Sequence, residues 1–350
     1  RFDLSQSEFG LAIFPMTSAM FGWSGFSMTL CRKILEFTAR NMETGTGTPW
    51  MEYNMFVNLY QFLTGEWKED KHFQQMYDYC ISRGNIWTLL HYVLFHGLQF
   101  IETGLPGKTE LMINKLAMLG EDYQVNLAMA QHYRLFANYT FRYRKLDQNI
   151  AKADEGIEYT GKTGHDNILS IILLTKASSL AMKGEIDRAW AVFREGEKRA
   201  MERKILKMWY SAIFVTKAYI ELEELKSNPS DPFLQKSIVQ TVKKAVSASD
   251  KVMNDHIVAH QLSGSVNTLL GNYRKAFKHF GIAIDLGEKY EGKLELSRTF
   301  FETGKCLTHA NGSINSFRGR KAEDYLTKAR ELFSEMGLEY DLRELDRLSR

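Results

Sequence analysis

The sequence predicts an all-α protein, a right-handed superhelical α-solenoid of about eight helical hairpins with a C-terminal capping helix. Three observations predict it. Apolar residues recur at i, i+3, i+4 and i+7 along nearly the whole chain, and no alternating strand pattern interrupts them. A glycine turn followed five residues later by alanine occurs at Gly184–Ala189 and again at Gly271–Ala276. Weaker turns extend this series at intervals of about 40 residues, the period of a helical-hairpin repeat.

Turns at glycine, proline and charged clusters divide the chain into consecutive elements. The last helix carries only Leu342, Leu345 and Leu348 as apolar residues, so its outer face is polar, as a terminal cap requires. Because each repeat buries its apolar face against its neighbours, we expect residues 1–350 to form a single domain. The chain begins with Arg1 in a helical pattern, which we interpret as a fragment of a larger protein. The predicted hairpins span 5–43, 49–82, 84–119, 122–161, 165–202, 204–252, 255–290 and 293–336, and the capping helix spans 338–349.

The helix that begins at Tyr273 illustrates the packing within one hairpin. Ala276, Phe280 and Ala283 lie on one stripe, while the neighbouring basic residues face away. Gly264, twelve residues before Ala276, is the matching small residue on the preceding helix. We therefore expect these two helices to approach each other closely.

The composition excludes several classes of protein. A net charge of +3 is too small to indicate a nucleic-acid partner. Cys31, Cys80 and Cys306 are odd in number and widely spaced, so they predict buried reduced thiols in a cytoplasmic protein. Residues 9–31 carry no charge, but Pro15, glycines and hydroxyl side chains interrupt them. We interpret that stretch as a repeat hairpin and expect no membrane span.

The motifs resemble a known repeat family. Residues 184–196 and 264–283 resemble the tetratricopeptide repeat, with glycine at the turn and alanine then an aromatic residue on the second helix. The other repeats are longer and more degenerate, and so look like those in the C-terminal sensor domains of large signalling ATPases, including maltose-regulator-type transcription factors and ATPase-linked cyclases and kinases. The ending Ala329–Leu342 is similar to the last repeat and cap of that group. The resemblance implies a domain that senses an effector or partner and controls a nucleotide-driven switch elsewhere.

No catalytic, metal or cofactor site is predicted. Residues 102–109 end like a phosphate-binding loop, but Glu102 occupies the position of the first glycine and a helical pattern precedes it. His256 and His260 share a helix face without an obvious third ligand, and Ile257 stands where a zinc protease needs glutamate. No serine or cysteine has the sequence context of a nucleophile. We therefore expect a non-enzymatic binding domain.

The predicted binding site lies on the concave face. In tetratricopeptide repeats the first helix of each hairpin lines this face. We expect a protein or peptide partner, or a small-molecule effector, in this groove. The alternatives are a plain peptide-binding scaffold without a signalling role and, less favoured, an enzyme with its site in the groove. Projecting the repeat register onto the chain selects six candidate residues: His96, Phe100, His132, Tyr139, Arg142 and Gln261.

Overall fold

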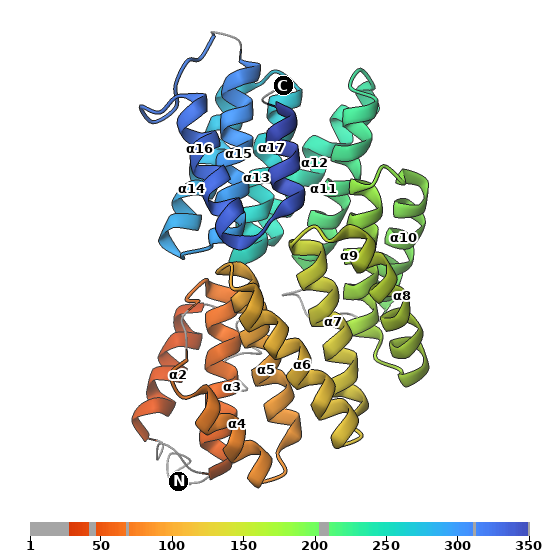
Figure 1. Cartoon of the computed structure of the whole chain (residues 1–350), viewed down its shortest axis with the longest axis vertical. Coiled ribbons are helices and arrows are strands. Elements are labelled where there is room, and N and C mark those ends of the chain that lie inside the picture. Colours follow the sequence, from red (N-terminus) through yellow and green to blue (C-terminus); the bar gives the residue numbers. More distant parts are fainter. Residues whose placement is uncertain (1–27, 42–46, 68–69, 203–209, 311–312, 349–350) are drawn as a thin grey trace.

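The computed structural model describes residues 28–41, 47–67, 70–202, 210–310 and 313–348. Over these ranges the regular structure is helical, and the only β pairing is an isolated bridge between Phe317 and Arg320. Figure 1 shows the helices stacked side by side around a common centre. The helices are α2 (Met28–Asn41), α3 (Gly47–Thr64), α4 (Phe73–Ser82), α5 (Ile86–Glu102), α6 (Pro106–Asp122), α7 (Asn126–Arg142), α8 (Leu146–Thr163), α9 (Asp166–Met182), α10 (Ile186–Glu202), α11 (Tyr210–Ser227), α12 (Pro232–Ala248), α13 (Met253–Leu269), α14 (Tyr273–Lys289), α15 (Lys293–His309), α16 (Ala322–Met336) and α17 (Glu339–Leu348).

These bounds confirm the predicted all-α solenoid. From the second hairpin onward, each predicted hairpin contains two helices, and its turn falls where the sequence places a glycine or charged cluster. Gly184 and Gly271 have φ angles of +82° and +71°, a left-handed conformation that costs glycine little. Arg144 adopts a φ of 52° in the corresponding turn between α7 and α8, without a glycine. The first predicted hairpin lies mostly outside the described residues, which begin at α2.

The close approach predicted within the α13–α14 hairpin is present. Ala276 is fully buried on α14. A Cβ atom built on Gly264 would overlap the ring of Phe280, with its Cζ atom only 2.7 Å away. The absence of a side chain at position 264 therefore allows the aromatic ring to lie against the backbone of α13.

The odd-numbered helices form the inner layer of the solenoid. From α5 to α15, each odd-numbered helix contacts the next odd-numbered helix as well as its own hairpin partner. Each even-numbered helix from α6 to α14 packs on the odd-numbered helices before and after it in the chain, and α8 and α10 can be seen at the right-hand edge of Figure 1. An inner helix has neighbours on most sides, which is why α9 is apolar around most of its circumference, with thirteen buried residues.

The solenoid turns far enough to bring its first hairpins against its last ones. Helix α3 contacts α13, and α5 contacts α15. Trp67, just after α3, packs with Ile257 of α13 in a small buried cluster. A Cβ atom on Gly292 would lie 2.8 Å from the Trp67 ring, so only glycine fits at that contact. These contacts close the turn, so the concave side of the solenoid surrounds a central cavity.

The three cysteines are buried and form no disulfide within the described part of the chain. None of the described helices has both the length and the apolar character that a transmembrane segment requires. Most of the uncharged stretch 9–31 lies outside the described residues.

Candidate binding cavity

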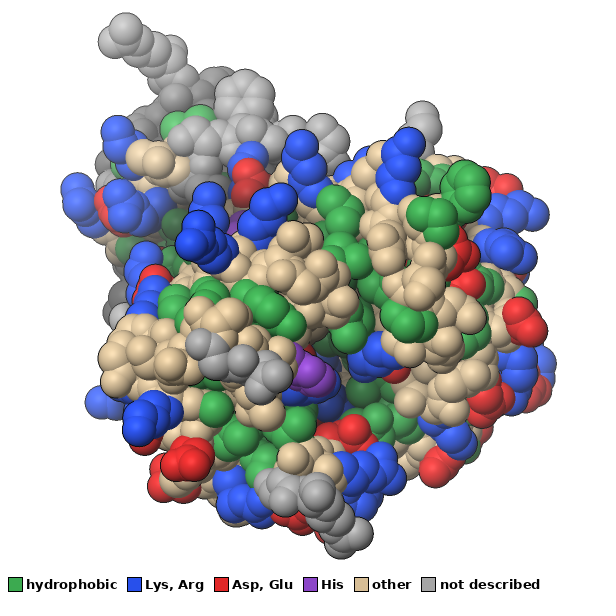
Figure 2. Space-filling view, turned by 90° about the horizontal axis from the view of Figure 1, so that it is seen from above, with side chains coloured by type: hydrophobic (Ala, Val, Ile, Leu, Met, Phe, Trp, Pro, Cys, Tyr) green, Lys and Arg blue, Asp and Glu red, His purple; other side chains and the backbone are tan. Residues whose placement is uncertain are grey.

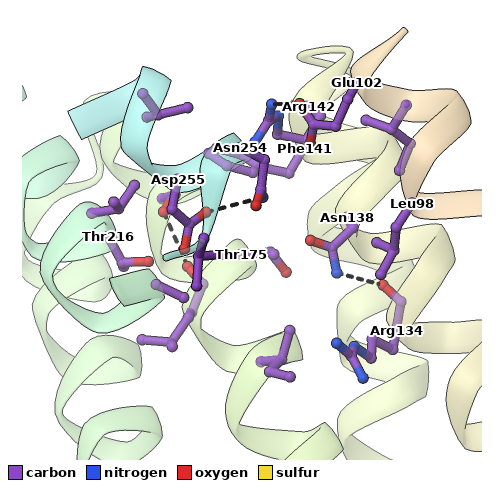
Figure 3. A pocket seen from close by; sticks show the side chains of 18 of the residues that line it. Leu98, Glu102, Arg134, Asn138, Phe141, Arg142, Thr175, Thr216, Asn254 and Asp255 are labelled. Carbon is purple, nitrogen blue, oxygen red and sulfur yellow. Dashed lines mark hydrogen bonds and ion pairs between the residues drawn. The ribbon is translucent and has the colours of Figure 1, made fainter. Parts of the chain in front are cut away.

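The inner helices enclose a cavity with about 800 Å³ of empty space, including the part that opens to solvent. Figure 3 shows polar side chains from several helices around it. In Figure 2, which views the molecule from above, acidic and basic side chains are both spread over the visible surface. The cavity lining comes from α3, α5, α7, α9, α11 and α13: Phe62, Leu98, Ile101, Glu102, Arg134, Asn138, Phe141, Arg142, Ile171, Leu174, Thr175, Ser178, Ala212, Val215, Thr216, Tyr219, Asn254, Asp255 and Val258, with Val252 just before α13.

Helix α7 contributes a polar stripe to this wall. Arg134, Asn138 and Arg142 are spaced by four residues, so they lie on one helix face. The Asn138 amide donates to the backbone carbonyl of Arg134 over 3.0 Å. Burial lowers the pKa of the Arg134 guanidinium to about 9. At 1.5 Å per residue the stripe extends about 12 Å, the length of three to four residues of an extended chain.

The first turn of α13 faces this stripe with Asn254 and Asp255 (Figure 3). Asp255 accepts a hydrogen bond from the Ser211 hydroxyl at 2.6 Å and one from the Asn254 amide at 3.1 Å. Burial raises the pKa of the Asp255 carboxyl, against the lowering effect of the Ser211 hydrogen bond. The amide oxygen of Asn254 is buried and has no hydrogen-bond partner among the described residues.

A buried ion-pair network connects the cavity to the closure of the solenoid. Arg142 lies 2.6 Å from Glu102 of α5 and 3.2 Å from Glu295 of α15. Arg298 bonds Glu295 at 2.7 Å and Asp341 of α17 at 3.1 Å. Arg298 also donates to the backbone carbonyl of Arg142, at the end of α7. These bonds link helices from the first and last thirds of the chain.

The two carboxylates that share Arg142 differ in their surroundings. Burial raises the pKa of Glu102 to about 7, because desolvation outweighs the attraction of Arg142, and repulsion from Glu295 and Asp255 adds to the shift. Burial also opposes ionisation of Glu295, but the nearby guanidinium groups, Arg298 foremost, lower its pKa below the ordinary value. Glu102 is thus the member of the network that titrates near neutral pH, and it lines the cavity.

Of the six residues predicted to bind a partner, Arg142 lines the cavity and the other five do not. His96 is buried beside Asn58 and Tyr92, and Gln261 is buried within α13. The Tyr139 hydroxyl donates to Glu110 at 2.6 Å, on the side of α7 that faces α6.

The two remaining predicted residues also contact other parts of the fold. His132 forms a hydrogen bond of 3.0 Å with the carbonyl of Ile113. Phe100 lines a separate pocket with Trp67 and lies beneath the Lys108 ammonium. The six-residue surface stays a prediction, and the structure gathers only one of its members at the central cavity.

The repeat register explains why the cavity residues were missed. The sequence projection chose Tyr139 on α7 as the inward residue, whereas the wall of the cavity uses Asn138. A shift of one residue rotates the inward direction by about 100°. One partial sequence signal was available: α9 is rich in apolar residues but also contains four buried hydroxyl residues, of which Thr175 and Ser178 line the cavity while Ser170 and Ser179 do not.

The other motifs occupy ordinary structural positions. Residues 102–109 form the turn between α5 and α6 and the start of α6. His260 and His279 are joined by a 3.0 Å contact between their Nδ1 atoms, and the ring of His256 packs edge-on against His260. No set of three histidine, cysteine or carboxylate side chains among the described residues is arranged to hold a metal ion.

Comparisons with known proteins support the architecture. No protein-family model matches the chain, and no curated protein matches it in sequence. Among solved structures, the chain is similar to a Rap protein complexed with competence and sporulation factor. The similarity covers 97% of both chains with a TM-score of 0.53 and 11% sequence identity. At that identity the comparison shows a shared helical-repeat fold over nearly the whole length of the chain.

Proposed function

We propose that this chain is a helical-repeat interaction domain that binds a short extended peptide in its central cavity. The main support for this proposal is that polar side chains from several inner helices line the same central cavity. Asn138, Asn254 and Thr175 present amide and hydroxyl groups there, which are the partners that peptide N–H and C=O groups require. The similar Rap structure contains a bound factor, which is consistent with a ligand-binding role for this fold.

The proposal extends to a non-enzymatic sensor within a larger cytoplasmic signalling or transcription regulator. The resemblance of Ala329–Leu342 to the cap of signalling-ATPase sensor domains supports this context. The ion pairs of Arg142 give a physical route for such signalling. A ligand that changes the environment of Arg142 or Glu102 also changes the contacts that hold the first hairpins to the last.

Filling the cavity tests the proposal. Thr216→Trp places a large ring in the cavity wall, whereas Ser247→Trp adds the same ring to the exposed surface of α12. A random pentapeptide library is incubated with each protein, and retained peptides are identified by mass spectrometry. We expect the original chain and Ser247→Trp to retain a common set of peptides and Thr216→Trp to lose it while keeping its helical circular-dichroism spectrum. Retention of the same set by folded Thr216→Trp, or of no peptide by any protein, contradicts the proposal.

A further inference from the structure

The end of the cavity near α13 carries more buried negative charge than positive charge. Asp255 receives its hydrogen bonds from a neutral hydroxyl and a neutral amide, and no arginine or lysine of the described chain forms an ion pair with it. Its neighbour Glu102 shares the single cation Arg142 with Glu295. The group that is joined to or adjoins Arg142 has three guanidinium groups and four carboxyl groups: Arg142, Arg144 and Arg298 against Glu102, Asp255, Glu295 and Asp341. A fourth guanidinium of the cavity wall, Arg134, lies eight residues away along α7 and is outside this group.

Two acceptors and one donor in this group are buried without a hydrogen-bond partner among the described residues, and one of the acceptors is Oε2 of Glu295, beside Arg142. The other acceptor and the donor belong to residues that line the cavity. The amide oxygen of Asn254 is buried without a hydrogen-bond partner in the described part of the chain. The Nε–H of Arg142 is also buried without a hydrogen-bond partner. The Arg142 side chain is only 10% exposed, and it lines the cavity. Leaving such groups unpaired in a folded protein costs about 1–3 kcal/mol each, so a bound molecule that satisfies them gains affinity.

We infer that this end of the cavity binds the free N-terminus of a peptide, with its α-ammonium group at Asp255, Glu102 and the amide oxygen of Asn254. The carbonyl oxygen of the first peptide residue accepts from the Nε–H of Arg142. An ammonium group supplies three N–H donors, which matches three acceptors in this region. It also supplies the positive charge that the buried group lacks. The inference rests on the proposed peptide-binding function.

A site that needs both an ammonium group and a neighbouring carbonyl oxygen distinguishes a peptide N-terminus from other cations. In a peptide, the α-ammonium nitrogen and the first carbonyl oxygen are separated by only the Cα and carbonyl carbon atoms. Figure 3 shows Asn254 between Asp255 and Arg142, so we assign the nitrogen to Asp255 and Asn254 and the oxygen to Arg142. A lysine ammonium carries no neighbouring carbonyl and leaves the Nε–H of Arg142 unsatisfied. A bare metal ion provides no acceptor at all.

Three synthetic pentapeptide libraries test the inference by affinity selection. The first has free N-termini, the second is N-acetylated and free of lysine, and the third is N-acetylated with lysine at the first position. We expect retention of the first library only, with acetylation lowering affinity at least tenfold, the loss typical for a hydrogen bond to a charged group. Equal retention of the acetylated, lysine-free peptides overturns the inference while leaving the peptide-binding function intact. Equal retention of the lysine library also overturns it, because the site then takes any ammonium group.

A matched pair of variants locates the effect. Asp255→Asn removes the charge but keeps a side chain of the same shape that still bonds Ser211, whereas Asp250→Asn makes the same change in the exposed turn before α13. We expect Asp255→Asn to bind free-N-terminus peptides at least tenfold more weakly and to narrow the difference between free and acetylated peptides. We expect Asp250→Asn to keep the original affinity for free-N-terminus peptides and the original difference between free and acetylated peptides. If folded Asp255→Asn still prefers free-N-terminus peptides over acetylated ones as strongly as the original chain does, the assignment of the N-terminus to Asp255 is wrong. If no library binds to any of the proteins, both this inference and the proposed peptide-binding function are wrong.

Discussion

Replacing Gly264 with alanine tests the closest helix contact in the α13–α14 hairpin. The new Cβ atom meets the edge of the Phe280 ring, whose Cζ atom lies 2.7 Å from the ideal Cβ position. Phe280 is fully buried, so its ring has no open space into which to move. The backbone of α13 must shift to relieve the overlap, and overpacking of this kind costs about 1–3 kcal/mol.

The helix propensity of alanine opposes this cost. Gly264 lies in the middle of α13, where alanine stabilises a helix by about 0.5–1 kcal/mol over glycine. The net expectation is a loss of up to about 2.5 kcal/mol in the free energy of unfolding. Gly161 is the matched control, because it lies within α8 with no atom within 4 Å of an added Cβ. Gly161→Ala therefore gains the propensity without the clash.

Urea denaturation monitored by circular dichroism measures both variants. We expect the unfolding midpoint of Gly264→Ala to fall and that of Gly161→Ala to stay equal or rise. The double variant Gly264→Ala with Phe280→Leu recovers part of the loss, since a smaller side chain leaves room for the methyl group. A Gly264→Ala protein as stable as Gly161→Ala would refute the packing described for this hairpin.

Four further predictions concern stability. Ala276→Leu inserts a larger side chain at a fully buried position and lowers the free energy of unfolding by about 1–3 kcal/mol, and an unchanged melting temperature would argue against the helix register. Arg298→Met leaves Glu295 and Asp341 buried with fewer cationic partners, so we expect a loss of about 3–5 kcal/mol in chemical denaturation, whereas a loss below 1 kcal/mol would show that the network does not hold the solenoid closed. Burial lowers the pKa of His96 from 6.5 to about 4. Between these two pH values the unfolded chain binds a proton at His96 that the folded chain does not, so the free energy of unfolding falls on acidification by up to about 1.4 kcal/mol per pH unit. Glu102 acts in the opposite sense between pH 4.5 and 7 because its pKa is raised to about 7, so Glu102→Gln should lose stability more steeply on acidification than the original chain.

The local features of the fold could be predicted from the sequence because each depends on neighbouring residues. Helical periodicity and turn residues fixed most helix bounds to within a few positions, as at Gly184 and Gly271, where a left-handed turn favours glycine. The close contact at Gly264 followed from the small residue at a fixed distance from Ala276. The lack of a disulfide among the three cysteines, within the described residues, agrees with their odd number and wide spacing.

The candidate site could be predicted only in part. The sequence placed it on the inner helices, and Arg142 does line the cavity. Asn254 and Asp255 carry no local pattern that distinguishes them from other polar residues at the start of a helix. Their role as part of the cavity wall depends on which face of α13 turns inward, and an error of one residue in register changes that face.

The sequence by itself therefore determined the helices, their turns and their pairing into hairpins, since these depend on contacts between residues near each other in the chain. Only the tertiary structure decided that the solenoid closes on itself. Small rotations between successive hairpins add along the chain and bring α3 to α13 and α5 to α15. The total rotation depends on all the hairpins together, so it cannot be predicted from the sequence of one repeat. The same accumulation places Arg142 between Glu102 and Glu295, residues almost two hundred positions apart, and so creates the charged cavity from hairpins that carry no such site individually.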